Sequence, residues 1–147
     1  MAWMIIRVRG TIHARHDIRE TLEHLHLLRP NHATIVPERP EFRGMLARVQ
    51  GYVTWGEAEP ATVTELLKVR GTTDEGGQLA ANGTAADLGA ITLTVLERGL
   101  THAPGIRPLF RLKAPTGGWR STKKPFSLGG ALGYRGRQIN DLARRML

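Results

Sequence analysis

Trp3-Met4-Ile5-Ile6-Arg7-Val8 is the first of three short apolar runs that decide the fold of this 147-residue chain. Its β-branched and aromatic residues favour a strand, as do those of the runs at residues 33–36 and 52–55. Between the strands, residues 18–28 and 41–49 repeat apolar side chains at helical spacing, which predicts two amphipathic helices. Strands that alternate with helices over such short connections predict a β-α-β-α-β unit, with one layer of helices on one sheet.

The ends of these elements carry their own signals. Asp17 followed by Glu20 has the pattern of a capping box for the first helix, Pro37 ends the second strand, and Gly51 ends the second helix. The periodicities of strands and helices then predict which side chains form the core. The expected core residues are Ile5, Val8, Leu22, Leu25, Ile35, Met45, Val49 and Val53.

The rest of the chain is expected to extend this unit, in two parts. The expected elements are a helix at 61–70, a surface loop at 72–84, a helix at 85–98 (where 91–95 also alternates like a strand), a strand at 109–113, a glycine-rich basic loop at 114–136, and a final helix with Ile139, Leu142, Ala143 and Met146 on one face. The predicted organisation is a core at 1–58, a helical extension at 59–106, and a basic arm with the C-terminal helix at 107–147.

Charge is distributed unevenly along the chain. Residues 107–147 hold ten Lys and Arg residues and one acid, whereas the first 106 residues are close to neutral. The same C-terminal quarter holds four of the eight aromatic residues and many glycines. In addition, Arg7 and Arg9 share one face of the first predicted strand, where two like charges favour an anionic partner. This pattern predicts a folded module whose basic arm binds a polyanion and orders fully only on binding it.

Composition excludes several classes of function. The chain has no cysteine, so disulfides, thiolate catalysis and cysteine-based zinc sites are excluded. It has no run of 18 apolar residues and no basic start followed by a long apolar stretch, which predicts a cytoplasmic protein without a membrane span. Serine occurs only at Ser121 and Ser127, outside any nucleophile motif, and the carboxylate pairs fall in predicted turns. We expect no enzyme activity, no cofactor and no small-molecule substrate.

Two clusters were weighed as ligand sites. Five of the six histidines lie in 20 residues, but His24 and His26 point in different directions on a helix, so surface histidines that contact phosphate are favoured over a metal site. Gly130, Gly133 and Gly136 lack the spacing of a nucleotide-binding loop. Their lack of side chains instead favours close packing of the backbone against RNA phosphate.

An ordered set of short segments spans most of the chain. It comprises Arg7-Val8-Arg9, Leu22 with Leu25, Gly44-Met45-Leu46, Trp55-Gly56-Glu57, Leu66-Leu67, Arg70-Gly71, Phe110-Arg111-Leu112, Gly117-Gly118, Gly129-Gly130, Leu132-Gly133-Tyr134-Arg135-Gly136, Ile139-Asn140 and Arg145-Met146. In this set the chain resembles the L-thirty family of large-subunit ribosomal proteins, in its long archaeal and eukaryotic form. Residues 72–90 and Ala114-Pro115-Thr116 depart from the family pattern.

The resemblance implies an α+β fold with a ferredoxin-like core, in which helices pack on a three-stranded antiparallel sheet. It also implies a structural role in the large ribosomal subunit: binding of large-subunit ribosomal RNA near the docking region of the small 5S RNA, beside neighbouring ribosomal proteins. The alternatives are a stand-alone nucleic-acid chaperone or DNA-binding protein, or an adaptor whose basic end binds an acidic protein. Co-sedimentation with large subunits in high salt separates these, because only an integral ribosomal protein stays bound.

The expected mechanism is neutralisation of phosphates by basic side chains, with glycine backbone close to RNA and aromatic rings stacked on bases. The residues expected to contact RNA first are Arg111, Lys113, Arg120, Lys123, Lys124, Arg135 and Arg137. The second group is Arg7, Arg9, His13 and Arg43.

Overall fold

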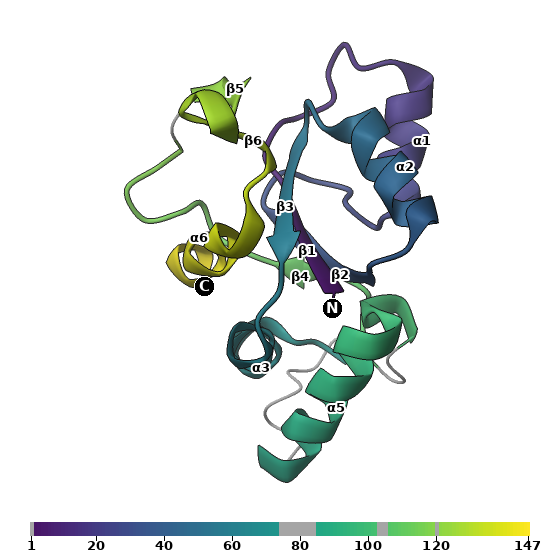
Figure 1. Ribbon diagram of the computed structural model, residues 1–147, viewed down its shortest axis with the longest axis vertical. Helices are drawn as coiled ribbons and strands as arrows, with labels where there is room; N and C mark the ends of the chain where they lie inside the picture. Colours follow the sequence, from purple (N-terminus) through teal and green to yellow (C-terminus); the bar gives the residue numbers. More distant parts are fainter. Residues whose placement is uncertain (1, 74–84, 103–105, 120) are drawn as a thin grey trace.

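A six-stranded mixed sheet forms the centre of this α+β protein, whose computed structural model describes residues 2–73, 85–102, 106–119 and 121–147 (Figure 1). The first part of the chain contributes the elements β1 (Ala2–Arg7), α1 (His16–His24), β2 (His32–Pro37), α2 (Pro40–Val49) and β3 (Val53–Glu57). The β-α-β-α-β order predicted for this part is therefore confirmed. Strand β1 lies between β2 and β3 and is antiparallel to both, as the three-stranded core was expected to be.

The first helix is shorter than the apolar periodicity predicted. Its N-cap is Arg15, which makes no capping hydrogen bond, and Asp17 lies inside the first turn, so the predicted capping box is wrong. The helix ends because His26 adopts a left-handed backbone with φ of 60°. The Leu27 amide then donates to the Leu22 carbonyl (2.9 Å) and the His26 amide to that of Glu23 (3.0 Å), which is a Schellman C-cap. The expected helix from 18 to 28 therefore stops at His24.

The second part of the chain adds three helices, three strands and short 3₁₀ turns in the described residues. These are α3 (Pro60–Arg70), α5 (Ala85–Arg98), η1 (Leu100–His102), β4 (Phe110–Arg111), β5 (Ser121–Pro125), η2 (Phe126–Leu128), β6 (Gly130–Tyr134), η3 (Gly136–Gln138) and α6 (Ile139–Met146). The helices expected at 61–70, at 85–98 and at the C-terminus are confirmed. The strand expected at 109–113 is reduced to two residues, and most of the loop expected at 72–84 lies outside the described residues.

The glycine-rich segment 114–136 is not one loop, which corrects the sequence-based expectation. Strand β6 runs parallel to β3, with Thr54 beside Gly133, and the Thr54 hydroxyl donates to the Gly133 carbonyl at 2.8 Å. Strand β5 pairs with β6 at the edge of the sheet, which gives the order β4-β2-β1-β3-β6-β5. Because two of these pairings are parallel, the sheet is mixed and not purely antiparallel. That this segment gains order on binding RNA stays a prediction.

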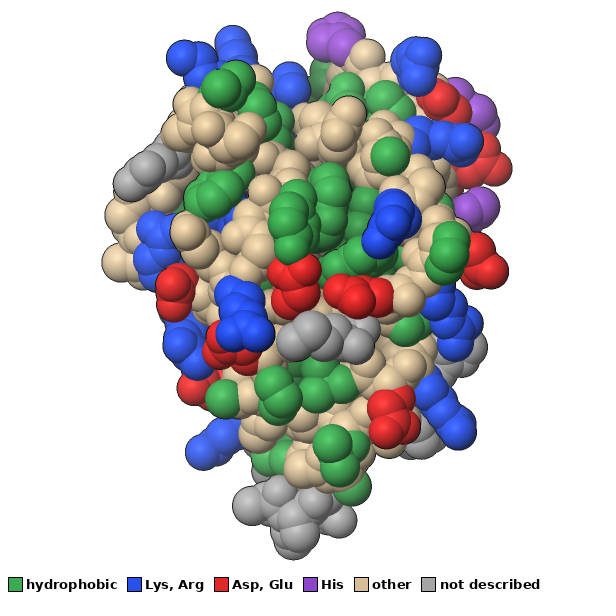
Figure 2. All heavy atoms as spheres, in the orientation of Figure 1, with side chains coloured by type: hydrophobic (Ala, Val, Ile, Leu, Met, Phe, Trp, Pro, Cys, Tyr) green, Lys and Arg blue, Asp and Glu red, His purple; other side chains and the backbone are tan. Residues whose placement is uncertain are grey.

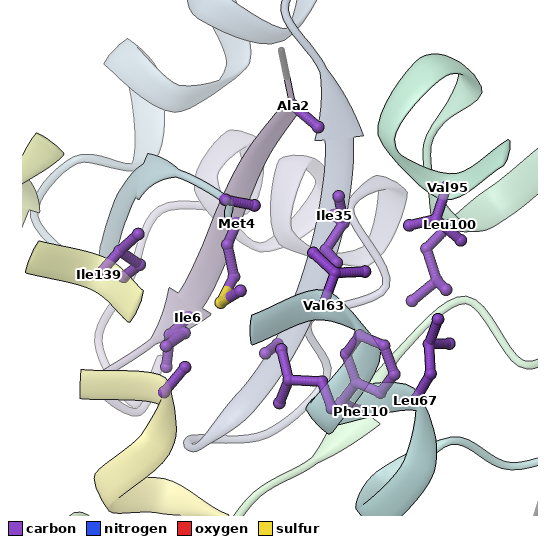
Figure 3. Packing of buried hydrophobic residues seen from close by; sticks show 14 of the residues in the cluster. Ala2, Met4, Ile6, Ile35, Val63, Leu67, Val95, Leu100, Phe110 and Ile139 are labelled. Carbon is purple, nitrogen blue, oxygen red and sulfur yellow. The ribbon is translucent and has the colours of Figure 1, made fainter. Parts of the chain in front are cut away.

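Helices cover both faces of the sheet, so the two-layer arrangement holds only for residues up to 58 (Figure 1). Helices α1 and α2 pack on the face that carries Trp3 and Ile5. Helices α3, α5 and α6 cover the opposite face, which carries Met4 and Ile6. Figure 3 shows residues of this second cluster, among them Met4, Ile6, Ile35, Val63, Leu67, Val95, Leu100, Phe110 and Ile139. An uninterrupted apolar run such as β1 is typical of a strand that is buried on both sides.

The predicted core residues are buried with one exception. Met45 is only partly buried and packs at the margin of the cluster under α1 and α2. Seven of the eight are buried, as expected: Ile5, Val8, Leu22, Leu25, Ile35, Val49 and Val53. The four apolar residues expected on one face of the last helix are buried as well: Ile139, Leu142, Ala143 and Met146.

Asn140 joins α6 to the end of β3 and is 2% exposed. Its side-chain amide donates to the carbonyls of Glu57 and Arg137, both at 2.9 Å, and its oxygen accepts from the Glu59 amide at 2.9 Å. Asn140→Ala removes three hydrogen bonds to partly buried backbone groups, so we expect the free energy of unfolding to fall by about 2–4 kcal/mol. Urea denaturation measures this loss. The exposed neighbour Gln138 provides the control, since Gln138→Ala should change stability by less than about 0.5 kcal/mol. Equal stabilities of the two variants would contradict the structural role of Asn140.

Candidate nucleic-acid interface

One end of the sheet gathers basic residues from four separate segments. Strand β1 ends there at Arg7, β2 begins there at His32, and β4 ends there at Arg111, which pairs directly with His32. The chain beyond β4 stays close, because the Leu112 amide donates to the carbonyl of Asn31 at 3.2 Å. Strands β5 and β6 both begin at this same end, since they run parallel to β3.

We call this surface the basic strand end. Its exposed or half-buried members are Arg9, His13, Arg29, His32, Arg111, Lys113, Lys123 and Lys124. Figure 2 shows Lys, Arg and His side chains along the upper margin of the molecule, which lies over β5, the start of β3 and the loop before α1 in Figure 1. Four of the acids lie towards the other end of the strands: Glu57 ends β3, Glu38 and Glu59 follow β2 and β3, and Glu97 is near the end of α5. The basic strand end therefore joins basic side chains from several segments, and these four acids lie away from it.

Arg7 lies at this end, but its guanidinium faces inward. The side chain is buried, and its three donor groups bond the carbonyls of Leu27 (2.9 Å) and Arg9 (2.9 Å) and the hydroxyl of Thr11 (3.0 Å). Burial lowers the pKa of Arg7. These bonds tie the end of β1 to the turn after α1 and to the loop that carries His13. Arg7 thus organises the basic strand end and does not present its charge to a partner.

Arg135 has a comparable internal role at β6. Its Nε donates to the Thr54 hydroxyl at 2.8 Å, one terminal nitrogen donates to the Ala131 carbonyl at 2.7 Å, and its guanidinium lies 4.8 Å from the centre of the Phe126 ring. Burial, with a smaller effect of Arg145, lowers the pKa of Arg135 to about 10. The residue remains a cation at neutral pH, but its hydrogen bonds are made within the protein.

The other predicted RNA contacts lie partly at the basic strand end and partly away from it. Arg9 is half-buried and lies over the Tyr52 ring, 5.4 Å from its centre. Arg43 is exposed on α2 and lies over Trp3 at 5.9 Å. Five more are exposed at or near the strand ends: His13 in the loop before α1, Arg111 and Lys113 at β4, and Lys123 and Lys124 on β5. Arg137 is exposed beside Glu57 and Glu59. Arg120 lies outside the described residues. The structure therefore brings together the residues of β4, β5 and the β1 loop, but not Arg43 or Arg137.

A hollow of about 340 Å³ lies between the β5–β6 unit and α6. Trp119 and Phe126 line it together with Arg135 and Arg145, while Asp141 contributes one acid. Apolar ring faces beside the exposed guanidinium of Arg145 have the chemistry that binds an unstacked nucleobase next to its phosphate.

His32 belongs to the basic strand end, although the distribution of charge along the sequence did not predict it as a contact residue. Burial lowers the pKa of His32 from its ordinary value of 6.5, and the charges of Arg111, Arg29 and Arg7 lower it further. A folded-state pKa below the unfolded value means that protonation favours unfolding. The stabilising contribution of neutral His32 is present above pH 6.5 and is lost as the pH falls below that value towards the folded pKa.

We therefore expect His32→Gln to lose less stability than the parent chain between about pH 7 and about pH 5. Urea denaturation at a series of pH values measures this. His16→Gln, at an exposed position on α1, is the control and should follow the parent profile. If the free energy of unfolding fell equally with decreasing pH in the His32 variant and in the parent, the lowered pKa of His32 would be contradicted.

Within the described part of the chain, no three His, Asp or Glu side chains come together in a way that could hold a metal ion. In the same residues, no helix combines the length and apolar character needed to cross a membrane.

Comparison with known proteins gives a consistent result. The model of the family described as Ribosomal protein L30p/L7e matches residues 3–53. The chain is 42% identical to the large ribosomal subunit protein uL30 of Methanopyrus kandleri, in an alignment that covers 95% of this chain and all of the relative. It is 40% identical to the uL30 protein of Korarchaeum cryptofilum, over 97% of this chain and 93% of that one. For the Methanosphaera stadtmanae uL30 protein the identity is 37%, over 99% of both chains.

Proposed function

The chain belongs to the ribosomal protein L30p/L7e family, as a structural and non-enzymatic constituent of the large ribosomal subunit, and we propose that it binds large-subunit ribosomal RNA through the basic strand end. The observation that carries this proposal is the convergence of basic side chains from β4, β5 and the loops around β1 at one end of the sheet. Phosphate neutralisation by such side chains supplies the sequence-independent part of RNA affinity.

The dimensions of this surface suit an extended RNA segment more than a small ligand. Strands β4 and β5 are the two edges of the six-stranded sheet. Five spacings of about 4.8 Å separate them by roughly 24 Å. Lys123 and Lys124 on one edge and Arg111 on the other can therefore neutralise phosphates several nucleotides apart, with Arg9 and Arg29 between them. A binding surface of this breadth recognises RNA by the shape of the RNA and the charge of its phosphate backbone.

Some residues in this proposal hold the surface in place, and others contact RNA. Within the described residues, no ion pair is made by the exposed side chains that are the proposed phosphate contacts: Arg29, Arg111, Lys113, Lys123 and Lys124, with His13 beside them. Arg7 and Arg135 are positioning residues, because their guanidinium groups hydrogen-bond other parts of the chain. The hollow lined by Trp119 and Phe126 is the proposed site for an unstacked base.

The finer location, near the docking region of the 5S RNA, is supported by the family resemblance. We propose it together with contacts to neighbouring ribosomal proteins. Ultraviolet cross-linking of purified large subunits tests both the protein surface and the location in the subunit. The cross-linked peptide identifies the surface of the protein that contacts RNA, and the cross-linked RNA identifies the region of the ribosome.

We expect RNA-linked peptides from residues 9–15, 29–32, 111–113 and 121–124. The opposite end of the sheet is the internal control, and peptides covering 57–70 should carry few links. Links confined to 57–70 would contradict the proposed surface. Links from the basic strand end to RNA far from the 5S region would contradict only the finer location.

A further inference from the structure

A second surface differs from the rest of this basic protein in both shape and charge. A hollow of about 340 Å³ lies between α2 and the β3–β6 side of the sheet. Helices α1 and α2 pack over β1 and β2, so the rings of Trp55 on β3 and Tyr134 on β6 are left partly uncovered, with Trp3 at the base. Figure 2 shows hydrophobic side chains gathered in this hollow at the centre of the face, with two acidic side chains directly below them.

The rings in the hollow are arranged to receive a cation. The centres of Trp55 and Tyr134 are 6.3 Å apart and their planes are inclined by 50°. The Trp55 side chain is half-buried, and that of Tyr134 is exposed. Arg43 already lies over the remaining ring, Trp3, at 5.9 Å, which is the same kind of contact made within the chain. The faces of Trp55 and Tyr134 have no such cation among the described residues.

Two carboxylates border these rings. Glu57 accepts a hydrogen bond from the Tyr134 hydroxyl, and Glu38 lines the same hollow. The hydrogen bond to Glu57 raises the pKa of Tyr134, and burial and the charges of Glu57 and Glu38 raise it further. Neither glutamate makes an ion pair within the described part of the chain. Arg43 also lines the hollow, so two carboxylates and one guanidinium leave a net negative charge there, beside the half-buried Trp55 and the exposed Tyr134. The protein as a whole has a net charge of +8.

We propose that this groove binds a basic segment of a partner protein, with an arginine or lysine side chain placed over Trp55 and Tyr134 and paired with Glu38 and Glu57. Charge complementarity favours this occupant over RNA, because the two carboxylates outnumber the guanidinium of Arg43, which already lies over Trp3. Cation–π contact and a carboxylate partner together are the recognition chemistry of an arginine side chain. RNA at the basic strand end and a basic protein segment in the groove would then occupy different faces.

This inference goes beyond the proposed RNA contact, because it concerns other residues and another class of partner. The full chain with Trp119→Phe is the reporter, since the two remaining tryptophans, Trp3 and Trp55, both line the groove. The probe is a peptide of alternating arginine and glycine, titrated at low salt and followed by tryptophan fluorescence. Because the whole protein repels a basic peptide, binding reports the local site.

Glu38→Gln with Glu57→Gln should weaken peptide binding by roughly 3- to 20-fold, as expected for two partly exposed charges. The glutamine at 57 can still accept from Tyr134. Glu20→Gln with Glu97→Gln is the charge-matched control, at exposed positions outside the groove, and should change affinity by less than about twofold. Tyr134→Leu, which removes the ring but keeps an apolar side chain, should weaken binding by about 3- to 10-fold.

Two results would overturn the proposal. One is peptide affinity that is unchanged in both groove variants, with folding verified by circular dichroism. The other is a single-stranded RNA oligonucleotide that changes the fluorescence of Trp3 and Trp55 and binds more tightly after the two Glu→Gln changes. Neither result would bear on the basic strand end, whose phosphate contacts use different residues.

Discussion

Replacing Gly56 by alanine is expected to lower the free energy of unfolding by about 3 kcal/mol or more. Gly56 is buried in β3, and a Cβ atom there would overlap the carbonyl oxygen of Gly136 and lie 3.0 Å from Cγ2 of Ile139. The neighbouring backbone cannot move aside cheaply, because the Arg135 amide bonds the Trp55 carbonyl at 2.9 Å. Urea denaturation of the variant measures the loss.

Gly44→Ala is the matched control for this substitution. Gly44 is an exposed residue inside α2, and a Cβ atom there would have no neighbour within 4 Å. The same change should therefore raise stability by about 0.5–1 kcal/mol, since alanine has the higher helix propensity. A Gly56→Ala protein as stable as the parent would show that β3 and the segment from Gly136 to Ile139 are not packed together.

Phe110→Ala is expected to cost about 3–5 kcal/mol of stability. The ring is fully buried, although it belongs to the two-residue strand β4 at the start of the basic C-terminal quarter. Figure 3 places it beside Leu67 of α3, in the cluster under α3, α5 and α6. Loss of the ring removes apolar contacts from the main core and leaves a cavity there. Thermal or urea denaturation measures the effect.

Phe126 is only half-buried in η2, so Phe126→Ala should lower the free energy of unfolding by clearly less, about 1 kcal/mol. The comparison also tests how residues 107–147 relate to the core. If they formed an arm independent of the rest of the chain, Phe110→Ala would leave the unfolding of the core unchanged. A cooperative loss of stability in the whole protein is the expected result.

The first half of the fold was predictable, because its signals are local. Runs such as Trp3 to Val8 and the helical spacing of Leu22 with Leu25 depend only on neighbouring residues, and these elements were confirmed. The end of α1 was not predictable, because it requires a left-handed backbone at His26, a residue type that does not mark such a position as glycine would. Strand β6 was missed because Gly130-Ala131-Leu132-Gly133-Tyr134 lacks the composition of a strand and is held by pairing with β3.

The candidate site was predictable in its charge and not in its geometry. The surplus of basic residues after position 107 is visible in the sequence, but counting charges cannot distinguish an exposed guanidinium from a buried one. Arg7 is satisfied by Leu27, twenty residues away, and Arg135 by Thr54, so both face inward for reasons that only the tertiary structure reveals. The aromatic groove likewise depends on the register that brings Trp55 beside Tyr134.

The salt dependence of binding to purified large-subunit ribosomal RNA tests the basic strand end most directly. Each lost phosphate contact should reduce the slope of log affinity against log salt by roughly 0.7 to 0.9. A variant with Arg111→Gln, Lys123→Gln and Lys124→Gln should therefore show a slope shallower by about 2 to 3. Its charge-matched control carries Arg39→Gln, Lys68→Gln and Arg98→Gln, at exposed positions away from the strand end, and should keep the parent slope. Equal slopes for the first variant and the parent, or a loss of slope in the control alone, would contradict RNA binding by this surface.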